Sequence, residues 1–185
     1  MEKDGDWQTI SSRRLKLTAL SPALLAALID FDRAEISRHS ALDFSAPWGD
    51  SVDVLKLRRD GILADPDYAP WSLRAISRRE DDVVIGHIGF HTRPDPTYLK
   101  ETVPGGVELG YTIFAPYRGS GYAQEACRSM MRWARGFSGV KQFVLSISPD
   151  NAPSLAIAEK LGFRQIGEQM DEIDGLEFVF TTTVD

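Results

Sequence analysis

The stretch VELGYTIFAPYRGSGYAQEA, residues Val107 to Ala126, decides how the rest of this chain can fold. Its first half alternates apolar and other side chains with the period of a β-strand. Pro116 ends that strand, because proline cannot donate a ladder hydrogen bond. Beyond Gly119 and Gly121, apolar residues recur with helical spacing as far as Phe137. The stretch therefore predicts a buried strand, a short turn and the beginning of a helix.

The turn between this strand and this helix has the composition of a phosphate-binding loop. Glycines let backbone N–H groups crowd around a ligand, and a helix start adds unpaired donors and a partial positive charge. A P-loop would need a lysine after the glycines, where the sequence has Tyr122. A dinucleotide fingerprint would need glycine or alanine where Gln124 stands. What remains is the pattern Arg118-x-x-Gly121-x-Ala123, or a glycine-rich helix start without a ligand.

Composition sets bounds on the class of protein. The chain has 185 residues, 43% hydrophobic and 26% charged, which fits one globular domain over 1–185. Apolar runs stay well short of eighteen residues and the N-terminus lacks a signal-peptide pattern, so we expect a soluble cytoplasmic protein without a membrane partner. The net charge of −6 argues against nucleic acid as a partner. Cys127 lies on the apolar helical stripe and is interpreted as a buried thiol, whereas Glu125 and Arg128 are interpreted as part of a solvated face.

The rest of the chain alternates predicted strands and helices without a repeat or a linker, which supports a single domain with its core over about 12–183. Further strands are expected over Ser12–Ala19, Trp71–Arg78, Val83–His91, Gln142–Ser148, Phe163–Gly167 and Leu176–Thr183. Helices are expected over Pro22–Phe31, over Ser51–Leu63 with an interruption at Gly61, and over Leu155–Leu161. Loops are expected over 32–50 and 94–106, and the last two strands should meet at the turn Asp174-Gly175.

Two segments resemble the signatures of the GNAT superfamily of N-acetyltransferases. Arg118-x-x-Gly121-x-Ala123 is similar to that family's coenzyme A pyrophosphate loop, Gln/Arg-x-x-Gly-x-Gly/Ala. The block PDNAPSLAIAEKLGF, Pro149–Phe163, resembles the second signature, N-x-x-S/A followed by E-K-x-G-F, and it follows at the family's usual distance. Ser154 and the opening SRRLKLTALSP resemble most closely the Rim-type branch, which is related to ribosomal-protein alanine acetyltransferases.

This resemblance implies an α/β (α+β) fold, in which helices flank a mixed, mostly antiparallel central sheet. The fourth and fifth strands of the family's sheet splay apart into a V, which would hold the pantetheine arm of acetyl-CoA. The pyrophosphate would rest on the amides at the start of the following helix. The resemblance assigns cofactor contacts to Tyr111, Ile113, Phe114, Arg118, Gly119, Ser120, Gly121, Tyr122, Ala123, Asn151 and Ser154.

The implied reaction is acetyl transfer, in which a neutral amine attacks the thioester. Glu108 is the candidate base, with a pKa that partial desolvation would raise toward the working range; the alternative is a solvated or ion-paired strand glutamate. A backbone N–H near Ile113 would meet the oxyanion. Many family members place a proton-donating tyrosine seven residues after the signature asparagine, but Ala158 stands here. This leaves Ser154, water or no donor as the acid.

The acceptor and the assembly stay open. We expect direct attack in a ternary complex of acetyl-CoA and a primary amine, either a small amine or a peptide N-terminus. The alternatives are a non-catalytic CoA-binding sensor or scaffold, and a nicotinamide-dependent redox protein, which the missing third glycine opposes. A homodimer is also left open. His87 and His91 lie four residues apart along a strand, about 13 Å, so they cannot share one zinc ion and we expect no metal site. One of them could line the acceptor site.

Overall fold

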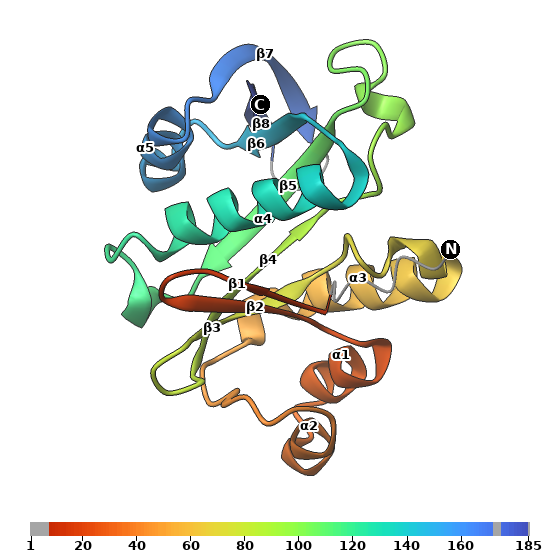
Figure 1. The fold of residues 1–185 in the computed structure, drawn as a ribbon, viewed down its shortest axis with the longest axis vertical. Coiled ribbons are helices and arrows are strands. Elements are labelled where there is room, and N and C mark those ends of the chain that lie inside the picture. The colour runs from red at the N-terminus through yellow and green to blue at the C-terminus, as the bar shows by residue number, and fades with distance from the viewer. Residues whose placement is uncertain (1–7, 172–174, 185) are drawn as a thin grey trace.

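An eight-stranded sheet runs through the protein, with the strand order β1-β2-β3-β4-β5-β6-β8-β7 (Figure 1). The computed structural model describes residues 8–171 and 175–184. The strands are β1 (Thr9–Ser11), β2 (Leu15–Ala19), β3 (Arg74–Arg78), β4 (Val84–Phe90), β5 (Val107–Ile113), β6 (Gln142–Ile147), β7 (Arg164–Asp171) and β8 (Gly175–Thr183). Neighbouring strands are antiparallel except β5 and β6, which are parallel. The prediction of a mixed, mostly antiparallel sheet flanked by helices is confirmed.

Helices cover both faces of this sheet. They are α1 (Pro22–Ile29), α2 (Arg33–His39), α3 (Val52–Ala64), α4 (Tyr122–Ser138) and α5 (Ala152–Lys160), with short 3₁₀ turns η1 (Gly49–Ser51), η2 (Pro66–Tyr68), η3 (Thr97–Leu99) and η4 (Ala115–Tyr117). Figure 1 shows α4 crossing the middle of the molecule, with α1, α2 and α3 grouped at the N-terminal half of the sheet. On the face opposite α4, Trp48 packs against His87 of β4 and Phe114.

Strands β5 and β6 separate soon after they begin. Val107 pairs with Phe143 and Glu108 pairs with Val144, and along the rest of these two fully described strands no further pair forms between them. Beyond that point β5 stays with β4 as far as Ile113, whereas β6 stays with β8. The two strands therefore form the V that the family resemblance implied for its fourth and fifth strands.

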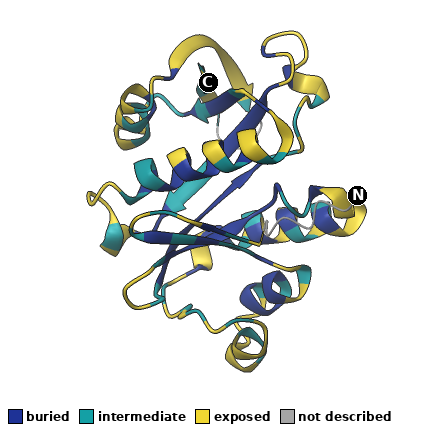
Figure 2. Ribbon diagram, in the orientation of Figure 1, coloured by how far each residue is buried: buried dark blue, intermediate teal, exposed yellow. Residues whose placement is uncertain are grey.

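The core fills the space between the sheet and its helices, where Figure 2 shows continuous burial. Phe90 and Phe143 are fully buried, with their ring centroids 6.2 Å apart, and Trp71 joins Phe90 to Trp133 of α4. Burial of one such side chain contributes about 1.5–3 kcal/mol. Within the two described ranges, no helix combines the length and the apolarity that a membrane crossing requires.

Several predicted boundaries differ from the structure. The strand expected over Ser12–Ala19 is a hairpin of β1 and β2, and α2 occupies part of the segment expected to be a loop. Gly61 does not interrupt α3: a β-carbon there would lie 3.2 Å from the ring of Tyr68, so this glycine makes room for a neighbour. β7 extends to Asp171, beyond the expected end at 167. Of the turn expected at 174–175, the first residue lies outside the described ranges.

Candidate active site

The V leaves part of the β5 main chain without a strand partner. The Glu108 carbonyl accepts a hydrogen bond from the His91 N–H at 2.9 Å. At the other end, the Phe114 N–H donates to the Ile85 carbonyl at 2.9 Å. Both bonds point toward β4, and main-chain direction alternates along a strand. The residues whose main-chain groups point into the gap are therefore Leu109, Tyr111 and Ile113. An extended ligand with amide groups can pair with such an edge.

Arg118 closes the outer end of β5. Its Nε donates to the Ile113 carbonyl at 2.8 Å, so the guanidinium is held against the strand end. The backbone reaches it through η4, which contains Pro116. The side chain of Phe114 is buried on the opposite face against Trp48, and its N–H points toward β4, so this residue directs neither group into the gap. Of the strand residues predicted to contact the cofactor, Tyr111 and Ile113 present main-chain groups to the gap.

The turn after Arg118 exposes a run of backbone N–H groups. Gly119 and Gly121 have φ values of 80° and 76°, in the left-handed region that glycine adopts at little cost. Gly121 caps α4 without a side-chain hydrogen bond. Between Gly119 and Gln124, no N–H donates to a group in the described part of the chain. These donors and the helix dipole favour an anion at this end of α4, with Ala123 buried beneath it.

Arg14, from the β1–β2 turn, holds this loop in place. Its Nε lies 2.6 Å from the Glu125 carboxylate, and its Nη1 donates to the Ser120 carbonyl at 2.9 Å. Its guanidinium also lies 4.6 Å from the ring centroid of Tyr122. Burial would raise the pKa of Glu125, but bonds from Arg14 and Ser12 outweigh it and lower the pKa. The interpretation of Glu125 as part of a solvated face with Arg128 is wrong, because its partner is 111 residues away.

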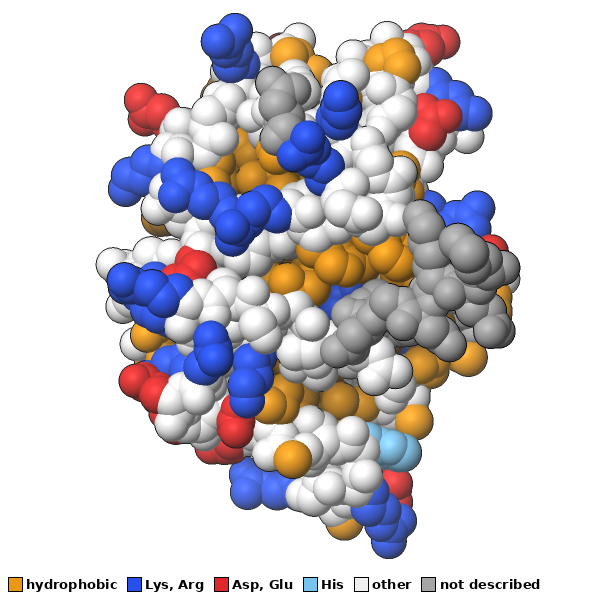
Figure 3. Space-filling view, viewed as in Figure 1, with side chains coloured by type: hydrophobic (Ala, Val, Ile, Leu, Met, Phe, Trp, Pro, Cys, Tyr) orange, Lys and Arg blue, Asp and Glu red, His pale blue; other side chains and the backbone are white. Residues whose placement is uncertain are grey.

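A basic hollow adjoins the same loop. Its volume is about 360 Å³, and it is lined by Arg13, Arg14, Arg78, Arg79, Glu80 and Tyr122. Figure 3 shows blue side chains gathered on the left of the molecule, around the start of α4. Two of these arginines are already paired, Arg14 with Glu125 and Arg78 with Asp81. The surroundings of the loop are nevertheless cationic, as a phosphate site requires.

The start of α5 approaches β5 from the other side. The Asn151 side chain accepts from the Ser154 N–H at 3.2 Å and so caps the helix, which is the turn chemistry that the sequence left open for it. Ser154 lies near Tyr111, whose hydroxyl is buried. Burial, more than the neighbouring Cys127, raises the pKa of Tyr111 to about 12, and the Ser154 hydroxyl opposes this rise. Ala158 is fully buried behind them.

Glu108 lies at the apex of the V, on the face opposite α4, and is 5% exposed. Its carboxylate accepts from Ser146 Oγ at 2.6 Å and from Tyr98 Oη at 2.9 Å, and His91 Nδ1 lies 3.5 Å away. Burial is the largest single influence and raises the pKa. The contacts with His91, Ser146 and Tyr98 together outweigh it and lower the pKa of Glu108 to about 2. The expectation of a raised pKa is therefore wrong.

The two strand histidines occupy different surroundings. His87 is buried, its Nε2 lies 2.9 Å from Ser51 Oγ, and its ring stacks on Trp48 at 5.6 Å. Burial, helped by Arg58, lowers the pKa of His87 to about 4, so it is a neutral core residue. The His91 side chain is 39% exposed and sits beside Glu108. Of the two, only His91 is positioned at the apex.

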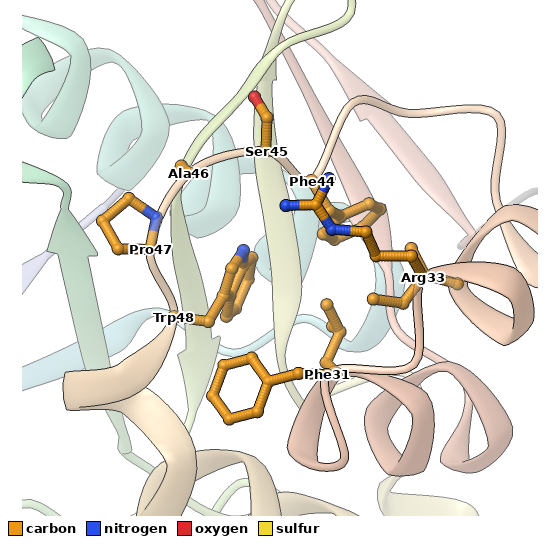
Figure 4. A pocket seen from close by; sticks show the side chains of 9 residues that line it. Phe31, Arg33, Phe44, Ser45, Ala46, Pro47 and Trp48 are labelled. Atoms are coloured by element: carbon orange, nitrogen blue, oxygen red, sulfur yellow. The ribbon is translucent and has the colours of Figure 1, made fainter.

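An apolar hollow of about 220 Å³ lies between α1, α2 and the segment that precedes α3. It is lined by Leu28, Phe31, Arg33, Ile36, Phe44, Ser45, Ala46, Pro47 and Trp48. Figure 4 shows the rings of Phe31, Phe44 and Trp48 around it, with the side chain of Arg33 extending toward Phe44. Because Trp48 also contacts His87 and Phe114, this hollow lies on the sheet face opposite α4.

The sequence is similar to those of proteins described as N-acetyltransferases. YnaD of Bacillus subtilis, described as an uncharacterized N-acetyltransferase, is 28% identical over 124 residues, covering 62% of this chain and 68% of YnaD. An N-acetyltransferase 9-like protein of Caenorhabditis elegans is 34% identical over 96 residues, covering 49% of this chain and 46% of that protein. The matched region thus spans about half the length of the nematode relative.

Solved structures agree in fold. RimJ of Mycobacterium smegmatis, in complex with CoA-disulfide, superposes with a TM-score of 0.66 at 16% identity, covering 97% of this chain and 88% of RimJ. The L7/L12 acetyltransferase RimL, in complex with coenzyme A, gives 0.65 at 16% identity, covering 96% and 98%. Proteins of the Rim type are therefore among the structural neighbours, as the sequence indicated. The sequence pattern described as the acetyltransferase (GNAT) domain matches residues 14–164, and the chain belongs to this family.

Proposed function

We propose that this protein transfers the acetyl group of acetyl-CoA to a primary amine, by direct attack within a ternary complex. One observation carries the proposal: the unpaired edge of β5 leads directly to the free amides at the start of α4. Pantetheine contains amide groups and can pair with the strand edge, while the pyrophosphate suits the amides and the helix dipole. A ligand of this form occupies both features at once.

Structural neighbours support this choice of co-substrate. RimL and RimJ were solved with coenzyme A species, and the acetyltransferase MccE was solved with acetyl-CoA and AMP. In this chain the pyrophosphate would lie on the amides from Gly119 to Ala123, with Arg118 at the beginning of the loop. Ser154 and Asn151 would face the pantetheine from α5. The basic hollow beside Arg14 adds a favourable field for the phosphates.

The acceptor would approach the apex of the V from the face opposite α4, where Glu108 and His91 lie. An ionised, buried carboxylate at this point favours a cationic acceptor, and so does the overall charge of −6. A small amine and a peptide N-terminus both meet this description. The oxyanion would be met by a main-chain N–H of β5 that points into the gap, near Ile113.

An amine panel tests the proposal. Spermidine, an aminoglycoside, and short peptides that begin with alanine or serine would each be incubated with acetyl-CoA, and release of free thiol would be followed. Turnover of at least one amine above the rate of acetyl-CoA hydrolysis is the expected result. Thermal protection by acetyl-CoA without turnover of any amine would favour a non-catalytic CoA-binding module instead. Absence of any protection would exclude both functions.

A further inference from the structure

Glu108 and His91 lie side by side at the apex of the V, together with Tyr98 and Ser146. Resting on the proposed function, we propose that His91 is the general base that removes the proton from the attacking amine, and that Glu108 is a positioning residue that orients the imidazole. Both side chains lie on the sheet face opposite α4, across the β4–β5 pair from one another. They stand at the last position where β5 and β6 still pair, so the gap opens beside them.

The Glu108 carboxylate is held in a fixed position. Its two oxygens are occupied by hydroxyl groups, from Ser146 on β6 and from Tyr98 on η3. Its side chain is 7% exposed, so an amine has little access to it. A carboxylate with these donors is a weak proton acceptor, since protonation would break the bonds that hold it. Its carboxylate instead lies 3.5 Å from His91 Nδ1, where it can hold the imidazole in one orientation.

His91 has the properties of a base. With Nδ1 directed at Glu108, the lone pair for catalysis belongs to Nε2. The Nε2 atom lies over Gly110, because a β-carbon at that position would come within 2.6 Å of it. Gly110 is the second residue of β5 beyond the last pair with β6, so the free nitrogen lies over the strand that borders the gap. Any larger residue at 110 would displace the ring from this position.

Within the part of the chain that the structure describes, the other charged groups around His91 leave its Nε2 free. Arg58 of α3 donates from Nη1 to the His91 carbonyl at 3.0 Å, which fixes the backbone of this residue. The second bond of that same nitrogen goes to the hydroxyl of Tyr68, also at 3.0 Å. Tyr98 is directed at Glu108, and burial raises its pKa, so it stays neutral. The titratable groups around His91 are thus the Glu108 carboxylate, the neutral Tyr98 phenol and the Arg58 guanidinium.

An acceptor that arrives as an ammonium ion first releases one proton to solvent. The neutral amine nitrogen then attacks the thioester carbonyl and a C–N bond forms, while one N–H proton passes to His91 Nε2. The C–S bond then breaks, and the sulfur leaves with the electron pair as a thiolate. The imidazolium returns its proton to solvent through its exposed edge, and the thiolate takes one proton from solvent. The products are the acetylated amine and free coenzyme A.

Kinetics of three variants test the proposal, using the fastest amine of the panel. His91→Asn should lower kcat by about a hundredfold or more and remove the acidic limb of the pH–rate profile. Glu108→Gln should lower kcat but keep an acidic limb, because the imidazole remains. In His91→Ala, added imidazole should restore part of the activity. His39→Asn is the matched control, since its side chain is 38% exposed and also lies beside a glutamate, and it should behave as wild type.

Thermal protection by acetyl-CoA, retained in every variant, would show that each folds and binds the co-substrate. The proposal would be overturned by a His91→Asn variant within tenfold of wild type with its acidic limb intact. It would equally be overturned if Glu108→Gln alone removed that limb. Either result leaves acetyl transfer itself established by the wild type. Failure of the wild type to acetylate any amine would instead overturn the proposed function, and this assignment with it.

Discussion

Replacement of Gly121 by valine separates the fold of the loop from its ability to bind phosphate. Gly121 has a φ of 76°, and an L-residue in this region costs roughly 1–2 kcal/mol, with β-branched residues at the upper end. Its β-carbon would meet only the Arg14 guanidinium, at 3.6 Å, which is ordinary van der Waals contact. The variant should therefore fold, with a Tm lower by about 2–8 °C for a chain of this size.

Acetyl-CoA should distinguish this variant from the wild type. A ligand at a hundred times its Kd stabilises the native state by about 2.7 kcal/mol, which is a Tm increase of about 5–11 °C here. In Gly121→Val the side chain and the altered backbone occupy the space in front of the free amides, so most of this increase should be lost. Thermal unfolding with and without acetyl-CoA, together with calorimetric titration, measures both effects.

Gly136→Ala supplies the control. Gly136 lies in the same helix, a β-carbon there would meet nothing within 4 Å, and its φ is not positive. Alanine should stabilise the helix by up to about 1 kcal/mol and leave acetyl-CoA protection unchanged. If Gly121→Val bound acetyl-CoA with the affinity of the wild type and kept full protection, the loop would not be the pyrophosphate site and the reasoning would be refuted.

Three further predictions concern the supports of the site. Arg14→Ala should weaken acetyl-CoA binding by about tenfold in calorimetric titration, because the loop loses its tie to Glu125; an unchanged Kd would contradict this. Ser154→Ala should change kcat by less than about tenfold and raise the KM for acetyl-CoA in steady-state kinetics; a hundredfold loss of kcat at unchanged KM would make Ser154 the acid. The low pKa of Glu108 stabilises the fold above pH 4.5, and this contribution, about 3 kcal/mol, should be lost as the pH falls from 4.5 to 2. Urea denaturation across this range should show a much flatter profile for Glu108→Gln.

The parts of the site that the sequence predicted are set by local chemistry. The loop from Arg118 to Ala123 depends on glycines with positive φ next to a helix start, and these act over a few residues. The cap at Asn151 is equally local, since its partner is three residues away. The opening of the V was predicted because the family resemblance covers this region; past Glu108, β5 stays paired with β4 and β6 stays paired with β8.

The parts that the sequence did not predict depend on distant partners. The pKa of Glu108 is set by burial and by three side chains from distant segments: His91 just after β4, Ser146 of β6 and Tyr98 of η3, which no local pattern joins. Arg14 contacts Ser120, in the turn before α4, from 106 residues away in the sequence. The one weak sign of such a contact in the sequence was Glu125, an acidic residue in the first turn of α4. Helix α2 was missed because it buries no residue in the core and so has no apolar period; its mark in the sequence is the cap Asp32.

The position of the proposed cofactor site follows from one chain connection. Strands β5 and β6 are parallel, and a parallel pair requires a crossover, here provided by α4. The crossover begins where β5 ends, so the N-terminus of α4 must lie at the same end of the sheet where the two strands have separated. The unpaired strand edge and the free helix amides are therefore adjacent for a topological reason. Residues such as Gly121 and Arg14 adjust the loop, but the placement of an unpaired strand edge beside a helix start with free N–H groups is built into the order of the elements.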